Sequence, residues 1–171
     1  MLRSAAGDRA AFDDLVTRHR ERVIALARRY LAAHDDAEDV AQEAFLRLYR
    51  GRERYRADAK FSTFLYPIVV NLCIEQSRKR KRRPAAEAAG EEPSGPRSME
   101  PERVALQRDL TARVKGALQR LPENQRIAVL LCRYEGRSYR EIAEVLGCTE
   151  KAVEAMLYRA RQTLSAELDL G

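Results

Sequence analysis

Apolar residues recur with helical spacing through most of the chain. Between residues 10 and 33 they fall at intervals of three and four, and the same spacing returns over 34–51 and from Ser62 to about Arg83. This spacing gathers apolar side chains on one face of an α-helix. Beyond the middle of the chain the pattern predicts four more helices, at about 103–120, 122–134, 138–146 and 149–166. An all-α fold is therefore expected.

Residues with known capping preferences mark the ends of these expected helices. Two pairs have the spacing of a capping box, Asp35 with Glu38 and Ser138 with Glu141. Further signals are the candidate N-caps Ser62 and Thr149, a first-position proline at Pro122, and helix-ending glycines at Gly51 and Gly147. Pro67 lies about five residues into the third long helix and should cost it one backbone hydrogen bond and bend it.

Residues 84–102 interrupt the helical pattern and divide the chain. This segment, "PAAEAAGEEPSGPRSMEPE", holds four of the six prolines and has too little apolar surface to fold alone, so it is predicted to be a flexible tether. Two small helical domains are expected on either side, over residues 1–83 and 103–171. The local net charge is +7 in the first, −4 in the tether and +3 in the second. Two basic modules joined by an acidic spacer suit contact with one polyanion.

Several classes of protein are disfavoured by what the chain lacks. The longest apolar runs, such as "IAVLLC", are far shorter than the ~20 residues of a membrane span. The N-terminal "MLRSAAGDRAAF" has no apolar segment of the signal-peptide type, so a cytoplasmic protein is expected. The three cysteines lack metal-site spacing and have no histidine nearby in sequence, so reduced thiols are expected, with no metal ion and no cofactor.

The stretch "EIAEVLGCTEKAVEAMLYRAR", residues 141–161, predicts two helices joined by a tight turn. On the second helix an apolar seam is formed by Val153, Leu157, Ala160 and Leu164. The opposite side carries Lys151, Glu154, Ala155, Tyr158, Arg159 and Gln162. Cations there can meet phosphates, and a carboxylate can accept a hydrogen bond from a cytosine amino group. Major-groove DNA binding and a solvated helical hairpin both fit this pattern.

The third expected helix combines aromatic residues with a cationic end. Phe61, Phe64 and Tyr66 alternate with polar residues, and the helix closes on "RKRKRR", residues 78–83. Aromatic rings beside a cationic ramp suit single-stranded nucleic acid, because unstacked bases can stack on the rings. A solvated basic tail behind core aromatic residues is the alternative.

The second expected helix, "DDAEDVAQEAFLRLY", has two distinct faces. Its inward stripe is Ala37, Val40, Ala41, Ala44, Phe45 and Leu48; a second stripe is Asp39, Gln42, Glu43 and Leu46. An acidic stripe that ends in an exposed leucine suits a basic protein partner. A plain solvated face and a carboxylate metal site are the alternatives.

These three segments, in this order, resemble the extracytoplasmic-function group of bacterial sigma factors. "DDAEDVAQEAFLRLY" is similar to the region-2 helix that grips the clamp helices of core RNA polymerase. "KFSTFLYPIVVNLCIEQSRKRKRR" is similar to the promoter-melting and −10-reading segment. The stretch from "LPENQRIAVLLC" to "LYRARQTL" resembles region 4, which reads the −35 element. The resemblance spans nearly the whole chain except the tether.

The resemblance implies a transcription initiation factor without catalysis of its own, controlled by an anti-sigma protein. The residues expected to bind core polymerase are Asp36, Asp39, Gln42, Glu43 and Leu46. Those expected to bind −10 DNA are Phe61, Ser62, Phe64 and Asn71 for bases and Arg78, Lys79, Arg80, Lys81, Arg82 and Arg83 for phosphates, with a preceding loop from about Asp58. Those expected to bind −35 DNA are Arg137, Arg140, Lys151, Glu154, Ala155, Tyr158 and Arg159.

The chain departs from the family pattern at four positions. Glu154 and Met156 stand where the −35 helix often carries cations, which implies altered base contacts and a weaker grip on phosphates. Phe64 replaces a usual tryptophan, which leaves a smaller stacking area, and Pro67 replaces a usual arginine. These departures bear on promoter preference rather than on the class of protein.

Three other functions remain open from the residues alone. A two-domain regulator could bind duplex DNA without polymerase, a nuclease could use the cluster of Asp36, Glu38 and Asp39, and an interaction module could act as a decoy for an anti-sigma protein. The regulator leaves the acidic stripe and the aromatic-basic helix unexplained.

Overall fold

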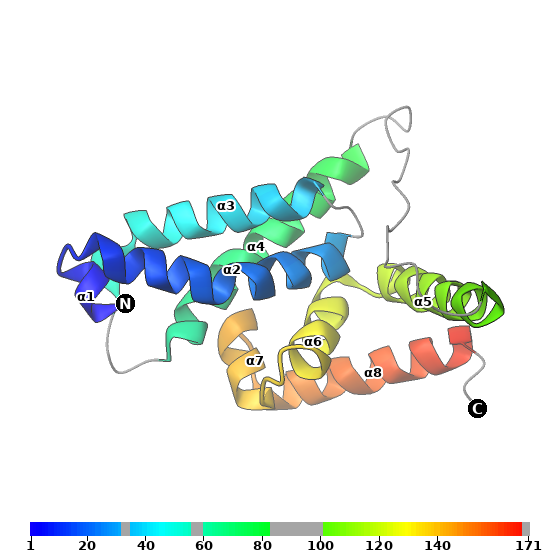
Figure 1. The fold of residues 1–171 in the computed structure, drawn as a ribbon. Coiled ribbons are helices and arrows are strands. Elements are labelled where there is room, and N and C mark those ends of the chain that lie inside the picture. Colours follow the sequence, from blue (N-terminus) through cyan, green and yellow to red (C-terminus); the bar gives the residue numbers. More distant parts are fainter. Residues whose placement is uncertain (32–34, 56–59, 83–100, 169–171) are drawn as a thin grey trace.

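The computed structural model describes residues 1–31, 35–55, 60–82 and 101–168. Within these ranges every regular element is helical (Figure 1), which confirms the all-α prediction. The elements are α1 (Leu2–Ala5), α2 (Arg9–Leu31), α3 (Asp35–Arg50), the 3-10 turn η1 (Arg52–Arg54), α4 (Phe61–Arg82), α5 (Pro101–Arg120), α6 (Glu123–Arg133), α7 (Tyr139–Leu146) and α8 (Glu150–Leu168).

Helices α2, α3 and α4 pack against one another through their apolar faces. All six residues of the predicted inward stripe of α3 are buried: Ala37, Val40, Ala41, Ala44, Phe45 and Leu48. They meet the buried second half of α2 and the middle of α4, where Leu65 and Val69 are almost fully enclosed. The amphipathic pattern alone is sufficient to predict the orientation of α3, because only one of its faces is apolar enough to be buried.

The C-terminal helices include the predicted helix–turn–helix. Ser138 and Glu141 form both hydrogen bonds of a capping box at the start of α7, and the Thr149 hydroxyl accepts a bond from the Ala152 amide at the start of α8. Gly147 ends α7 at φ +63°, in the left-handed region that favours glycine. These three signals from the sequence are confirmed.

Two other predictions of helix starts were wrong by one or two positions. Helix α4 begins at Phe61, so Ser62 lies inside the first turn and is not its N-cap. Pro122 is extended at ψ 145° and immediately precedes α6 instead of occupying its first position. Helix α4 continues through Pro67, whose missing N–H removes one intrahelical bond without ending the helix. The short helix α1 was not expected.

Some predictions concern residues outside the described ranges. The Asp35–Glu38 capping box depends on the Asp35 side chain, which is not among those described. The same holds for Arg83, for the loop around Asp58 and for most of the tether. Helix α5 nevertheless begins at Pro101, two residues before the helix was expected to start.

The C-terminal helices pack directly against the N-terminal ones (Figure 1). Helix α7 contacts α4, and α6 contacts α2. At the second contact the buried Arg126 guanidinium donates to the backbone carbonyl of Tyr30 at 3.2 Å and lies over its ring, 4.8 Å from the centroid. The same side chain donates to the carbonyls of Gln119 and Leu121, which fixes the start of α6 against α2.

Candidate nucleic-acid and protein interfaces

The outer face of α3 carries the predicted acidic stripe. Asp39 and Gln42 are exposed, and Leu46 leaves 42% of its surface in water although it lies on a helix with a fully formed core face. Glu43 accepts a hydrogen bond from Arg47 at 2.8 Å, which raises the pKa of that guanidinium. We call Asp39, Gln42, Glu43 and Leu46 the docking face.

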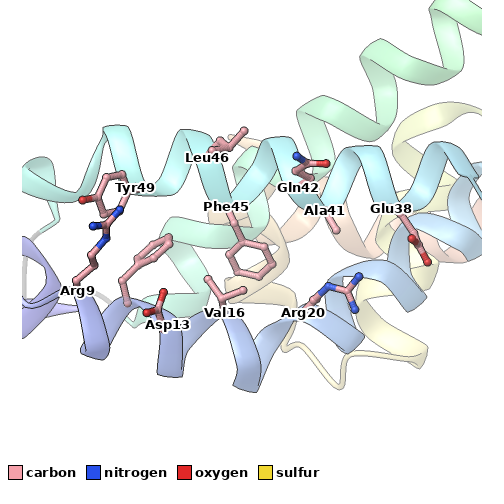
Figure 2. Close-up of a pocket in the computed structure, with 11 residues that line it drawn as sticks. Arg9, Asp13, Val16, Arg20, Glu38, Ala41, Gln42, Phe45, Leu46 and Tyr49 are labelled. Atoms are coloured by element: carbon pink, nitrogen blue, oxygen red, sulfur yellow. The ribbon is translucent and has the colours of Figure 1, made fainter.

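A groove of about 540 Å³ runs beside the docking face, between α2 and α3 (Figure 2). Phe45 and Val16 form its apolar floor, while Arg20 and Glu38 stand at one end. Gln42 and Leu46 belong to both the groove and the docking face. A partner helix laid on α3 would therefore find an apolar recess along one edge, flanked by charged groups.

Asp36 lies apart from the rest of the acidic stripe. Its carboxylate accepts a hydrogen bond from the Gln76 amide at 2.7 Å and lies 3.9 Å from the Arg80 guanidinium. Both partners belong to α4, so Asp36 connects α3 to the C-terminal end of that helix. This position indicates a structural contribution that does not depend on a protein partner.

The first turns of α4 display the predicted aromatic residues beside polar ones. Phe61 and Phe64 are half-buried: Phe61 packs on the His19 ring at 4.8 Å and Phe64 on the Tyr55 ring at 5.6 Å between centroids. Burial and neighbouring arginines lower the pKa of His19, so the imidazole beside Phe61 favours its neutral form. Asn71, further along, is exposed.

The C-terminal end of α4 forms the expected cationic ramp. Its described members are Arg78, Lys79, Arg80, Lys81 and Arg82, and all five are exposed. Arg78 donates to Glu123 of α6 at 2.9 Å, and this hydrogen bond raises its pKa. Arg80 reaches back to the Leu31 carbonyl at 3.4 Å. Concentrated positive charge at a helix end suits a phosphate backbone.

Helix α8 has the two faces that its sequence predicts. Val153 and Ala160 are buried in the seam, with Leu157 and Leu164 partly buried beside them. The outer face consists of Lys151, Glu154, Ala155, Tyr158 and Arg159; Ala155 is partly buried and the other four are exposed. We call these five residues the outer face of α8. Tyr158 exposes 62% of its surface.

Arg137 and Arg140, expected beside the outer face of α8, have different surroundings. Arg140 is exposed and lies 3.4 Å from Glu144. Arg137 lies against α4, with its guanidinium 4.7 Å from the centroid of the Tyr66 ring and 3.6 Å from Glu141. In this arrangement Arg137 is a contact between the two groups of helices.

Further residues form this contact between the two groups of helices, and sequence analysis did not predict them. Tyr66 is buried and donates a hydrogen bond of 2.5 Å to Glu135, whose side chain is 4% exposed. Lys60 donates to Glu141 at 3.0 Å and Thr63 donates to Glu144 at 3.3 Å. The partners are 69 to 81 residues apart, so no local pattern could have paired them.

Two ionisable groups at the contact have shifted pKa values. Burial and the hydrogen bond to Glu135 raise the pKa of Tyr66. The capping bond from the Ser138 amide, with Lys60 as a second donor, lowers the pKa of Glu141 to about 2. Both shifts favour the forms that make the contact at neutral pH, a protonated phenol and an ionised carboxylate.

The described residues contain no cluster of three or more histidine, cysteine or acidic side chains suited to a metal ion. Cys73 is buried between helices, and burial raises the pKa of its thiol to about 12. Such a thiol is unreactive at neutral pH. Among the described helices none is long and apolar enough to cross a membrane.

Comparison with protein families gives two matches along the chain. The family described as Sigma-70 region 2 matches residues 4–83. The family described as Sigma-70, region 4 matches residues 111–164. The docking face and α4 fall within the first match, and the outer face of α8 falls within the second.

Curated relatives match over almost the entire chain. RNA polymerase sigma-H factor of Pseudomonas aeruginosa is 35% identical over 95% of this chain and 88% of its own length. ECF RNA polymerase sigma factor SigM of Mycobacterium tuberculosis is 38% identical over 94% and 78%. ECF RNA polymerase sigma-E factor of Escherichia coli is 36% identical over 92% and 86%.

Two solved structures share this arrangement of helices. The structure of CnrH in complex with the cytosolic domain of CnrY aligns with a TM-score of 0.76 and 30% identity, over 99% of this chain and 94% of that one. The sigma factor RpoE from Bartonella quintana, in complex with the anti-sigma factor NepR, aligns with a TM-score of 0.72 and 24% identity, over 93% and 97%. The second likeness concerns the fold alone.

Proposed function

The chain belongs to the extracytoplasmic-function group of the sigma-70 family, and we propose that it binds core RNA polymerase and directs it to promoters by contacting their −10 and −35 elements. The observation that carries the proposal is the presence of three separate faces on one chain. These are the acidic docking face on α3, the aromatic and cationic α4, and the polar outer face of α8.

Polymerase binding is assigned to the docking face. Asp39, Glu43 and Leu46 combine negative charge with one exposed apolar side chain, which suits a basic, amphipathic partner helix. The groove beside α3 can receive an apolar side chain of that partner. Asp36 was expected to join this surface; its bonds to α4 favour a role in holding α3 in position.

Promoter contacts are divided between α4 and α8. Phe61 and Phe64, with Ser62 and Asn71, would receive unpaired −10 bases, while the cationic ramp would follow the phosphates. The outer face of α8 would enter the −35 major groove, where Lys151 and Arg159 meet phosphates and Glu154 and Tyr158 contact base edges. In the present arrangement Arg140 is available to contact the DNA phosphate backbone, and Arg137 is not.

We assign no catalytic activity and a cytoplasmic location to the protein. The carboxylates of Asp36, Glu38 and Asp39 do not form a metal-type cluster among the described residues, which gives the nuclease hypothesis no structural support. An anti-sigma protein that covers the polymerase- and DNA-binding faces would regulate it. That a relative of 30% identity, CnrH, was solved with a cytosolic protein domain on it supports this assignment.

A run-off transcription assay tests the proposal. The chain would be mixed with purified bacterial core polymerase and a library of candidate promoters, in parallel with Asp39→Arg/Glu43→Arg, which reverses the charge of the docking face. A matched control is Asp14→Arg/Glu21→Arg, which makes the same charge change on the exposed side of α2, at residues that do not line the groove.

Start-specific transcripts are expected from the parent and the α2 control and should disappear with the docking-face variant. A chain that binds duplex DNA but yields no transcript would contradict polymerase binding and leave a regulator that acts without it.

A further inference from the structure

The acidic residues between Leu121 and Gly147 all face the N-terminal helices. There are four of them, and each has a partner across the contact: Glu123 with Arg78, Glu135 with Tyr66 and Arg22, Glu141 with Lys60, and Glu144 with Thr63. In each of these four pairings the carboxylate lies on the C-terminal side of the contact and the hydrogen-bond donor on the N-terminal side.

Most of these donors belong to the segment assigned to the −10 strand. Lys60, Thr63 and Tyr66 lie just before or within the first turns of α4, and Arg78 begins its cationic ramp. A carboxylate accepts the same charge-assisted hydrogen bonds from ammonium, guanidinium and hydroxyl groups as a phosphate does. The four glutamates therefore occupy donors that a nucleic-acid strand would use.

Glu135 is the buried centre of this contact. It lies in the turn after α6, next to Gly136, whose φ of +62° lets the chain reverse there. Its carboxylate accepts a hydrogen bond from the Tyr66 hydroxyl at 2.5 Å and lies 3.6 Å from Arg22, while the Arg137 guanidinium lies over the Tyr66 ring. The outer pairs are weaker, because Lys60 and Arg78 are exposed and such pairs are screened by salt.

We propose that helices α6 and α7 hold the free chain in a self-inhibited form, with Glu135, Glu141 and Glu144 occupying the first turns of α4 as substitutes for the phosphates of the −10 strand. Helix α7 must leave α4 before that strand can bind. The outer face of α8 takes no part in the contact and stays open. This inference rests on the proposed −10 role of α4.

A first test removes the central hydrogen bond without changing charge. Tyr66→Phe deletes the hydroxyl that reaches Glu135, and Tyr30→Phe is the matched control, because the Tyr30 hydroxyl is buried without a hydrogen-bond partner among the described residues. The readouts are the radius of gyration from small-angle X-ray scattering and the anisotropy of a fluorescein-labelled pool of single-stranded DNA of random sequence.

Tyr66→Phe is expected to expand the chain and bind the pool about fivefold more tightly, since apparent affinity rises with the fraction of open molecules. Tyr30→Phe should match the parent in both measurements. Unchanged size and unchanged binding with Tyr66→Phe would overturn the inference.

A second test removes two of the carboxylates. Glu135→Gln/Glu144→Gln is compared with Glu150→Gln/Glu167→Gln, which makes the same charge change on α8, away from the N-terminal helices. Only the first variant should expand and gain affinity for the single-stranded pool. Equal gains in both variants would mean that net charge, and not release of α4, causes the effect, and would also overturn the inference.

Failure of this inference can be told apart from failure of the proposed function. Compaction is measured without polymerase, whereas function is read from run-off transcripts. A chain that drives transcription but shows no opening in either variant would retain its function and lose the self-inhibition. A chain that opens but yields no transcript would lose the proposed function.

Discussion

Helices α4 and α8 are the two candidate DNA-binding elements, and the structure leaves them in opposite states. The first turns of α4 are covered by α7, with Lys60 and Thr63 already bonded to glutamates. The outer face of α8 is open, with Lys151, Tyr158 and Arg159 exposed. Helices α4 and α8 carry similar side chains, but only α8 is open to DNA. The reason is that the glutamates of α6, α7 and the turn between them point towards α4.

Exposure of a candidate DNA-binding surface thus depends on the arrangement of the domains as well as on the residues of that surface. Both helices carry cations on their outer sides, and both pack an apolar face inward. Both helices also pack against the segment of α6 and α7, but its four carboxylates pair with Lys60 and with donors of α4. A free chain should therefore engage duplex DNA through α8 more readily than single-stranded DNA through α4.

The largest effect is expected on stability, from a substitution that removes the hydrogen bonds of Arg126 between α6 and α2. Arg126→Met removes a buried guanidinium that donates to the carbonyls of Tyr30, Gln119 and Leu121. We expect the free energy of unfolding to fall by about 3 kcal/mol, because hydrogen bonds to a charged group are lost and buried acceptors are left unpaired. Urea unfolding followed by circular dichroism measures this, with the exposed Arg133→Met as the control. Equal stability of the two variants would contradict the role given to Arg126.

Loss of aromatic area on α4 should come next. Phe64→Ala is expected to weaken binding of single-stranded −10 DNA by the polymerase-bound chain about tenfold, since a base stacked on an aromatic ring contributes about 1–3 kcal/mol. Phe64→Trp should strengthen it, because the stacking area grows. Fluorescence anisotropy with the complex measures both, and a Trp variant that binds no better than Ala would exclude stacking at this position.

A smaller change is expected from a substitution on the exposed outer face of α8. Arg159→Gln should lower duplex binding by the free chain and reduce the slope of log affinity against log salt by about 0.9, the value for one released counterion. Gln162→Ala, a neutral change on the same helix, should leave the slope unaltered. Titrations of a labelled duplex at several salt concentrations measure the slope. An unchanged slope would remove Arg159 from the phosphate contacts.

The smallest expected effect is a pH dependence at Glu141. Its pKa is lowered to about 2 in the folded chain, mainly by the Ser138 amide and then by Lys60, with Arg137 also nearby. A lowered folded pKa stabilises the fold above the ordinary value of 4.5, and this stabilisation is lost as the pH falls towards about 2. Glu141→Gln keeps the capping acceptor but loses the charge beside Lys60 and the helix N-terminus, so it should cost about 0.5 kcal/mol at neutral pH, and the difference from the parent should shrink through that window. Urea midpoints across the window measure it, and a constant difference would contradict this assignment.

The sequence was sufficient to predict the helices and to predict which of their faces are buried or exposed. The buried stripe of α3, the capping box at Ser138 and the left-handed Gly147 all follow from local spacing, because each depends on residues a few positions apart. Errors arose at Ser62 and Pro122. Helix α4 begins at Phe61, whose ring packs on His19, although Ser62 has the stronger capping preference, and α6 begins one residue after Pro122.

The contact between the two groups of helices could not be predicted in the same way. Glu135 lies in an ordinary polar turn in the sequence, and its partner Tyr66 lies 69 residues earlier. In the sequence, Arg137 and Arg140 are equally good candidates for contacts with the DNA backbone. In the structure, Arg137 packs on the Tyr66 ring and Arg140 remains exposed. Which cations are exposed and available to DNA thus depends on long-range packing that local periodicity does not encode.

The measurement that tests this account most directly is one titration carried out twice. Labelled single-stranded DNA with the −10 sequence recovered from the run-off library would be titrated with the free chain and with the chain bound to core polymerase, and the matching −35 duplex would be titrated alongside. The single strand is expected to bind tightly only to the polymerase complex, whereas the duplex should already bind the free chain. Equal affinity of the single strand for the free and polymerase-bound chain would contradict it.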